Sequence, residues 1–508
     1  MKLDFVRDTK RNMLAGLLYK LIRMVFPFVN RTLFLWLLGP EYLGLNGLFA
    51  SVLGVLSLAE LGFGTAVISS MYKPVAEGNR DLLRAYLRFY RTLYRWVGVA
   101  VFAFGLCLAP FLRRLIHGNL PEGLDLYVLY FAHLFNTAAS YFFFAYRGSI
   151  LAAHARRDVI SHISSVVEVG KYVCVFLVLL LTRNYYGYVA VTVAFTLVYN
   201  FLLLRESRRL FPDLFPEGKL PAELRGNVMA DAKSIFLHKV GGTVTNSTDN
   251  LVISGVLGLV VVAAYGNYYY VVTSVAGLVG MAAMSMVGGF GNKIHTESRE
   301  TNFRVFLKAN RMLMMATLWC AAVMAAVYQP FIEVWTRKDP TLIRHALTPL
   351  LMVMYFFVNQ SRQTLLTFKM AAALWKDDRM KPLVAGAVNL AVSVGLVLWL
   401  PKGWKLDGVI FGTIVSVLFI QIPWETHVLF TKYFTKEQKG RYLMEQFSFA
   451  GLAAWLCFGA WLAAFAVMAD GVMGVLVKTA TSACAATATL LLLFRKDCLD
   501  LIKSVKGR

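Results

Sequence analysis

The stretch LVAGAVNLAVSVGLVLWL at residues 383–400 contains no charged side chain. As a helix, an apolar run of about 20 residues is long enough to cross the hydrocarbon core of a bilayer. Apolar runs recur through the chain, for example at 97–112 and 173–181. The composition agrees, because 58% of the 508 residues are hydrophobic and 16% are charged, whereas soluble domains contain about 25% charged residues. The sequence therefore predicts an integral membrane protein.

Hydropathy, read together with the charged residues between apolar runs, predicts about 14 membrane-spanning helices. The predicted spans are 13–38, 43–69, 93–114, 125–150, 160–182, 187–205, 235–257, 262–290, 310–333, 343–368, 382–400, 407–427, 447–468 and 472–494. An even number of spans places both termini on the same side of the membrane. The predicted fold class is an all-α polytopic membrane protein.

The positive charge of the chain is unevenly distributed between its connections. The formal net charge is +23, and with alternate connections assigned to opposite sides, roughly 39 Lys and Arg fall on the side of the termini against roughly 8 on the other. This bias predicts a bacterial inner-membrane protein whose N- and C-termini are cytoplasmic. The same distribution argues against a nucleic-acid partner, because the charge is divided among short loops and forms no continuous groove.

The longest connection, residues 206–234, contains FPDLFPEGKLP and separates the first six spans from the rest. A weak repeat supports two related halves, because the step of eight residues from Arg31 to Gly39 recurs from Asn250 to Gly258. Paired bundles with a substrate path between them are a common transporter plan, and chance similarity of apolar sequence is the alternative. The predicted parts are a six-helix bundle at 1–205, a cytoplasmic linker at 206–234, a pseudo-symmetric six-helix bundle at 235–427 that shares a central cavity with the first, and two further helices with a basic tail at 428–508.

We find no motif for catalysis or nucleotide hydrolysis in the sequence. A phosphate-binding G-x-x-x-x-G-K-[ST] loop is missing, and so are H-E-x-x-H and G-x-S-x-G. The six cysteines show no paired spacing that would suggest disulfides or a metal site. We therefore expect no enzyme activity, no bound metal and no cofactor, and any energy source would be a Na⁺ or H⁺ gradient.

Basic side chains inside the first span are the most informative charges. Lys20, Arg23 and Arg31 follow one another at steps of 3 and 8, which places them on one face of a helix. Because a charge in the bilayer centre costs about 2.5–3.5 kcal/mol on insertion scales, this stripe should face protein or water. The alternative is that Lys20 and Arg31 extend to the two interfaces.

Polar residues inside three other spans are further candidates for a path through the membrane. Glu60 of the second span is expected to meet the basic stripe, either as a functional group or as a structural ion pair. In the seventh span, Asn246, Asp249 and Asn250 either bond neighbouring helices or contact sugar hydroxyls or a coupling cation. Arg362 in the tenth span is expected to line the same cavity.

A basic helical face follows the second span, where Arg84, Arg88, Arg91 and Arg95 recur at steps of 4, 3 and 4. Such a face is typical of an anchor on anionic lipid. The alternative is capture of an anionic headgroup of a substrate.

Three stretches resemble the polysaccharide transporter family of Wzx-type flippases, which belongs to the multidrug/oligosaccharidyl-lipid/polysaccharide (MOP) superfamily. They are RTLFLWLLGPEYLGLNGLF from residue 31, LSLAELGFGTA from residue 56 and NSTDNLVIS from residue 246. The resemblance implies two bundles in a V around a cavity, alternating access, and an undecaprenyl-diphosphate-linked oligosaccharide as cargo. The implied partners are this lipid-linked glycan, membrane lipids, and a polysaccharide polymerase with its chain-length machinery.

The resemblance also suggests roles for the candidate residues. Cationic partners suit a diphosphate, so the stripe of the first span is the expected diphosphate site. Asn246, Asn250 and Arg362 are the other expected substrate contacts. Asp249 is preferred over Glu60 as the group that binds the coupling ion, because a carboxylate paired with arginine keeps a depressed pKa.

Two alternatives of function remain at this stage. One is a cation-coupled small-molecule or drug antiporter of the same superfamily, which would favour an acidic cavity. The other is a membrane-embedded glycan polymerase or glycosyltransferase, which is disfavoured because the chain has no large extracytoplasmic loop.

Overall fold

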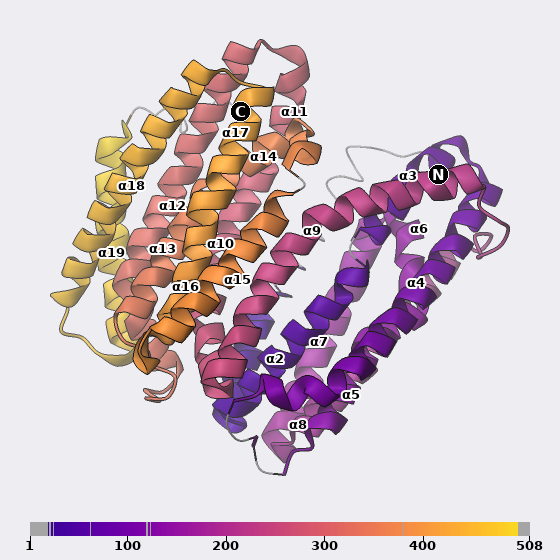
Figure 1. Ribbon diagram of the computed structural model, residues 1–508, viewed down its shortest axis with the longest axis horizontal. Helices are drawn as coiled ribbons and strands as arrows, with labels where there is room; N and C mark the ends of the chain where they lie inside the picture. The colour runs from indigo at the N-terminus through magenta and orange to yellow at the C-terminus, as the bar shows by residue number, and fades with distance from the viewer. Residues whose placement is uncertain are drawn as a thin grey trace. The chain divides into compact units, whose positions relative to one another are not determined.

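The computed structural model describes residues 19, 22, 23, 25–60, 62–117, 120, 121, 123–378 and 380–495, and within these ranges the side chains of 59, 234, 237–246, 375 and 376 are left undescribed. All regular secondary structure in the described part of the chain is helical (Figure 1). This arrangement is expected of an apolar chain in lipid, because a helix satisfies its backbone hydrogen bonds internally.

The helices of the first half follow one another with short breaks. After the N-terminal helix Val25–Leu37, they are α2 (Pro40–Leu56), η1 (Ser57–Glu60), α3 (Phe63–Glu77), α4 (Arg80–Leu108), η2 (Ala109–Leu115), α5 (Leu126–Phe142), η3 (Phe144–Arg147), α6 (Gly148–Ala153), α7 (Arg157–Thr182), α8 (Tyr185–Leu210) and α9 (Ala222–Leu257).

The helices of the second half include several that are interrupted. They are α10 (Leu259–Ser285), α11 (Val287–Thr296), α12 (Arg299–Trp335), α13 (Leu347–Ser361), α14 (Gln363–Ala371), η4 (Leu374–Asp378), α15 (Lys381–Trp399), η5 (Lys402–Trp404), α16 (Lys405–Val415), the π-helical turn η6 (Ser416–Gln421), α17 (Ile422–Lys432), α18 (Lys436–Phe465) and α19 (Gly471–Leu493).

Local sequence explains where several helices begin. Asp125 accepts hydrogen bonds from the backbone N–H groups of the first turn of α5, which is a favourable use of a carboxylate at a helix N-terminus. Thr435 and Gln438 form a reciprocal capping box at the start of α18. Gly78 ends α3 in the left-handed region, with φ of 67°.

The predicted spans coincide with observed helices. Among the described residues, nine helical segments are long and apolar enough to cross a membrane, and the bent pair α5 and η3–α6 makes a tenth. The four remaining predictions overlap other helices, which are Val25–Leu37, α2 with α3, α9, and α13 with α14. Residues 13–18 of the first predicted span lie outside the described part of the chain. The chain is an all-α multi-pass membrane protein, as the hydropathy predicts.

The chain divides into two compact units, Met1–Ala263 and Ala264–Arg508. The division falls inside α10, so α9 belongs to the first unit. The reason is packing, because α9 lies against α2 and α3 (Figure 1). A Cβ on Gly44 of α2 would lie 1.9 Å from the carbonyl oxygen of Leu259, the first residue of α10, so the close approach of α2 to the start of α10 requires glycine.

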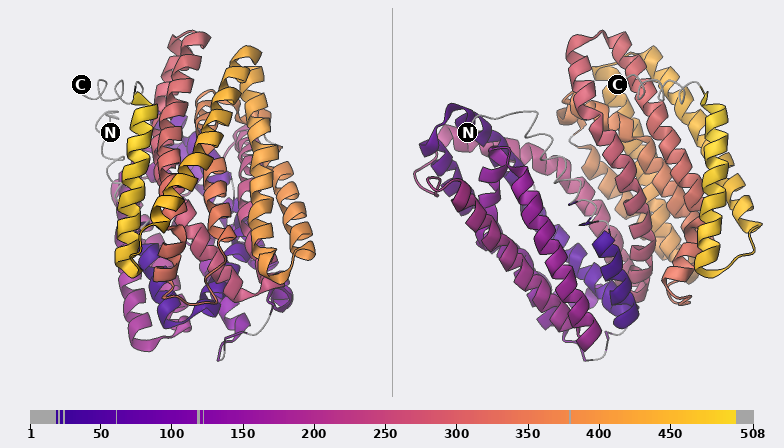
Figure 2. Two further views of the ribbon diagram at one scale, coloured as in Figure 1. Left: turned by 90° about the vertical axis from the view of Figure 1, so that its left-hand side faces the viewer. Right: turned by 180° about the vertical axis from the view of Figure 1, so that it is seen from behind.

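The core of the second unit is built on the long helix α12. Helices α18 and α19, orange to yellow in Figure 2, both pack on α12. Met314, Leu318 and Ala322 of α12 are buried together with Phe449 and Ala453 of α18. A second cluster of buried aromatic residues lies where α12, α14 and α17 meet, and contains Phe303, Phe306, Phe368, Phe430 and Phe434.

Candidate functional site

A group of buried charges occupies the interior of the second unit. Arg362 lies at the break between α13 and α14, and Glu425 in α17 is fully buried. Nη2 of Arg362 is 3.0 Å from Oε1 of Glu425, and its Nη1 donates to the amide oxygen of Gln421. Gln421 ends η6, and π-helical turns are frequent at functional sites. Two interrupted helices thus bring this ion pair together.

Two lysines and a second carboxylate extend this group. Nζ of Lys381 is 2.5 Å from Oε1 of Glu425 and 3.2 Å from Oδ2 of Asp378, and Lys369 also donates to Asp378. Burial opposes ionisation of Asp378, but the ammonium groups of Lys381 and Lys369 hold its pKa below the usual value. We call Arg362, Lys369, Asp378, Lys381 and Glu425 the charged network. It contains three cations and two carboxylates.

Several polar atoms in and beside the charged network have unused hydrogen-bonding capacity. Within the described part of the chain, Nε of Arg362, Oε2 of Glu425, Oε1 of Gln360 and Oγ1 of Thr426 are buried and have no hydrogen-bond partner. Leaving such groups unpaired costs about 1–3 kcal/mol each, and more for charged groups. The network can therefore accept further polar contacts.

The sequence predicted Arg362 as a cavity residue but missed the other members of the charged network. The structure places Arg362 in the interior, where 10% of its side chain is exposed and two side chains bond it. Lys369, Asp378, Lys381 and Glu425 lie at the ends of predicted spans, where charges ordinarily reach the interface. One feature of the sequence could have indicated burial. Charges of both signs gather in the short connection between the predicted spans 343–368 and 382–400.

In the first unit, the polar run of α9 faces a neighbouring helix at one position. Nδ2 of Asn250 donates to Oγ of Ser51 in α2 at 2.9 Å, and Oδ1 of Asn250 has no hydrogen-bond partner among the described residues. Asp249 is buried, with 3% exposed. Asn246 lies in α9 by its backbone, and its side chain is outside the described part. The sequence left two roles open for this run, a bond to a neighbouring helix or a contact with substrate or ion. The amide nitrogen of Asn250 makes a bond to a neighbouring helix.

Glu60 lies beside aromatic residues. Tyr94 of α4 donates to Oε1 of Glu60 at 2.5 Å, and the ring of Tyr94 is 4.3 Å from that of Tyr90 and 5.7 Å from that of Tyr141. The sequence led us to expect a contact between Glu60 and the basic stripe of the first span. Among the described residues no ion pair joins Glu60 to Arg23. The partner that the structure shows for Glu60 is the hydroxyl of Tyr94.

The basic stripe itself has separate contacts. Nη2 of Arg31 donates to the carbonyl oxygen of Ala263 in α10 at 3.1 Å. The guanidinium of Arg23 is exposed and lies 5.7 Å from the ring centroid of Tyr19. Lys20 is outside the described residues. Arg31 thus connects two helices, and Arg23 is the described member that remains accessible.

The basic face of α4 holds the connection between α8 and α9, a contact that the spacing of its arginines did not predict. Nη1 of Arg80 is 2.7 Å from Oδ2 of Asp213, and Nε of Arg84 donates to the carbonyl oxygen of Asp213. Arg88 donates to the carbonyl of Gly218 at 3.2 Å. The same connection receives a 2.7 Å hydrogen bond from buried Arg147 at the carbonyl of Leu214.

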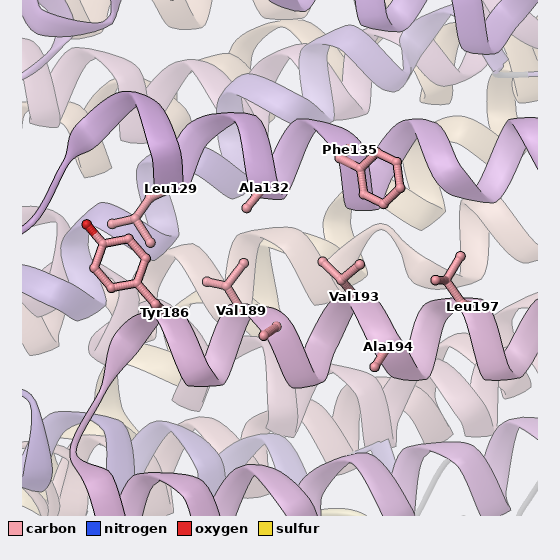
Figure 3. Close-up of a pocket in the computed structure, with 9 residues that line it drawn as sticks. Leu129, Ala132, Phe135, Tyr186, Val189, Val193, Ala194 and Leu197 are labelled. Carbon is pink, nitrogen blue, oxygen red and sulfur yellow. The ribbon is translucent and has the colours of Figure 1, made fainter.

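An apolar groove of about 460 Å³ lies between α5 and α8. Figure 3 shows Leu129, Ala132 and Phe135 of α5 opposite Val189 and Val193 of α8. Tyr186 provides a polar group at one end, where its hydroxyl accepts from the backbone N–H of Asp125. The groove offers hydrocarbon contact and no charge, so it differs in chemistry from the charged network.

A family model described as polysaccharide biosynthesis protein matches residues 9–287, which is more than half of the chain. No curated protein sequence matches the chain. Among the described residues no group of three or more His, Cys, Asp or Glu is arranged to hold a metal ion.

Solved structures of transporters share the fold at low sequence identity. The lipid II flippase MurJ in an inward closed conformation is 13% identical, with a TM-score of 0.62 over 96% of this chain and 100% of that one. A multidrug resistance MATE family transporter of the MOP superfamily in an inward-facing conformation is 15% identical, with a TM-score of 0.56 over 82% of this chain and 98% of that one. A mutant of the Vibrio cholerae MATE transporter VcmN is 13% identical, with a TM-score of 0.56 over 84% and 98%.

Proposed function

The chain belongs to the polysaccharide biosynthesis protein family, and we propose that it is a membrane transporter or flippase of the MOP superfamily and propose its cargo. The cargo is an undecaprenyl-diphosphate-linked oligosaccharide. It moves from the cytoplasmic to the outer leaflet of a bacterial inner membrane by alternating access, and both termini of the chain are cytoplasmic. The observation that carries the proposal is the family match over residues 9–287. A polysaccharide polymerase and its chain-length machinery would take over the product.

The charges of the first span support an anionic headgroup. A diphosphate that enters an apolar environment needs cationic partners, and charge-assisted hydrogen bonds from basic side chains supply them. Arg23 is exposed in the described structure, so its guanidinium can reach a ligand without first breaking an ion pair. Arg31 already donates to a backbone carbonyl, which leaves it fewer free donors. Arg23 is therefore the residue of this stripe to test.

The test is transport of a lipid-linked oligosaccharide by the purified protein in liposomes. We expect Arg23→Ala to reduce the rate at least about tenfold, the factor that corresponds to about 1.4 kcal/mol. Arg23→Lys should keep part of the rate, because charge matters more than forked geometry for a mobile diphosphate. Arg183→Ala, which removes an exposed arginine at the C-cap of α7, is the matched control. Full transport by Arg23→Ala would remove this residue from the path.

We assign the coupling ion, Na⁺ or H⁺, to Asp249. A coupling carboxylate must change its proton or cation occupancy during the cycle, and buried Asp249 is flanked in α9 by neutral polar residues that suit such a change. Glu60 accepts a hydrogen bond from Tyr94 and remains the rival carboxylate. Both carboxylates therefore enter the same experiment.

Imposed Na⁺ and pH gradients across the liposome separate the two candidates. We expect Asp249→Asn to abolish the dependence of the transport rate on the gradient, and Glu60→Gln to keep it. The neutral variants preserve the shape of each side chain, so a loss common to both would indicate damage to the helices. Retention of gradient-dependent transport by Asp249→Asn contradicts the assignment.

The fold similarity to multidrug transporters keeps a drug antiporter as a second candidate. Export of a cationic dye by the same liposomes measures it. Dye export together with no movement of lipid-linked oligosaccharide would favour the antiporter.

A further inference from the structure

A second groove, of about 390 Å³, opens on the second unit where α12, α18 and the end of α19 meet. Its volume is in the range of ligand pockets, about 300–1,000 Å³. One part of its wall is polar and the other is apolar. The polar residues are Arg311, Arg441, Glu445 and Ser448, and the apolar residues are Met444, Phe449, Leu452 and Phe494.

The polar part of the wall carries one net positive charge. Nε and Nη2 of Arg311 both donate to Oε1 of Glu445, at 3.2 and 2.5 Å, so these two charges compensate each other. Arg441 is exposed, and its guanidinium lies 5.9 Å from the ring centroid of Phe303. In the part of the chain that the structure describes, no carboxylate lies within ion-pair distance of Arg441. This guanidinium is therefore available to an anion.

The order of these residues along α18 matches the layers of a membrane. Arg441 lies in the second turn of a helix that begins at Lys436, Glu445 and Ser448 follow, and the apolar wall continues with Phe449 and Leu452. Helix α19 contributes Phe494 directly after its last residue. The charged end of the groove is thus at the membrane interface, and the apolar end points along the spans.

We propose that this groove binds an anionic glycerophospholipid of the phosphatidylglycerol type. The phosphodiester contacts Arg441 and the exposed edge of Arg311, whose side chain is 40% exposed, and one acyl chain lies on Phe449, Leu452 and Phe494. Basic pockets between transmembrane helices bind anionic lipid headgroups in this way. The single net charge fits a phosphodiester, whereas a polyprenyl diphosphate carries more negative charge than one free guanidinium neutralises. The site is therefore separate from the proposed cargo and does not depend on it.

The experiment measures lipid binding to the purified, delipidated full chain by native mass spectrometry. The probes are phosphatidylglycerol and phosphatidylcholine with the same acyl chains. We expect the parent to prefer phosphatidylglycerol, and Arg441→Ala to raise its dissociation constant about fivefold, the ratio given by about 1 kcal/mol per arginine near the membrane surface. Lys436→Ala removes the same charge from the same helix without lining the groove and should bind like the parent.

A second variant tests the apolar part independently of charge. Ser448→Trp fills the groove while Arg441 stays, and should weaken tight binding of both lipids. The proposal is overturned if Arg441→Ala and Lys436→Ala bind phosphatidylglycerol equally, or if Ser448→Trp binds both lipids like the parent. It is also overturned if a polyprenyl diphosphate displaces phosphatidylglycerol from the parent but not from Arg441→Ala, because the groove would then serve the cargo.

Discussion

The two units bury polar side chains in different ways. In the first unit, Asn250 to Ser51 and Tyr94 to Glu60 are single hydrogen bonds between helices, and the ion pairs there, such as Arg80 with Asp213 and Arg156 with Asp158, join two side chains each. In the second unit the charged network joins five ionisable side chains through Glu425 and Asp378. Single bonds between membrane helices average about 0.6 kcal/mol, whereas removal of one partner of a buried ion pair costs about 3–5 kcal/mol. The first unit can therefore exchange its contacts at low cost, and the second is held more firmly.

The largest effect should follow from removing the charge that joins the network. Glu425→Gln leaves Arg362 and Lys381 without their shared carboxylate, and we expect a loss of about 3–5 kcal/mol in the free energy of unfolding. An SDS titration of the purified protein measures this quantity. Glu437→Gln, an exposed change in the first turn of α18, is the control and should differ little from the parent. Equal midpoints for the two variants would show that the network does not stabilise the unit.

A smaller effect tests whether the network acts as one unit. In a double-mutant cycle of Arg362→Gln and Glu425→Gln, the loss for the double variant should be smaller than the sum of the single losses by about 0.5–3 kcal/mol. The reason is that removing both charges leaves no buried ion without its partner. The same SDS titration supplies all four free energies. Additive losses would mean that the two side chains stabilise the protein independently, in spite of the 3.0 Å contact.

Most of the fold could be predicted from the sequence because lipid imposes one strong rule. Each span must be apolar and helical, so hydropathy located ten of the predicted spans on helical segments of the described residues that are long and apolar enough to cross a membrane. The resemblance to a polysaccharide transporter family was confirmed by the family match. The packing of α9 against α2 and α3 was not predictable in this way, because hydropathy contains no information on which helices contact one another.

The candidate site was harder to predict, and the reason is the position of the charges along the spans. Arg362 stood out because it lies within an apolar run. Lys369 and Lys381 lie beside a connection, where sequence alone cannot distinguish a lysine in water from one buried against Asp378. The arginines of α4 show the converse: their spacing was visible, but their partner, the connection at Asp213, is far away in the sequence.

The smallest effect concerns the single hydrogen bond between α2 and α9, and it also tests a role in transport. Asn250→Ala and Ser51→Ala each remove the same 2.9 Å bond, so both should lower the free energy of unfolding by about 0.6 kcal/mol. Their transport rates should differ. Oδ1 of Asn250 has no hydrogen-bond partner among the described residues and can accept from a sugar hydroxyl, so we expect transport of lipid-linked oligosaccharide in liposomes to fall in Asn250→Ala and to persist in Ser51→Ala. Equal rates for the two variants would restrict Asn250 to helix packing.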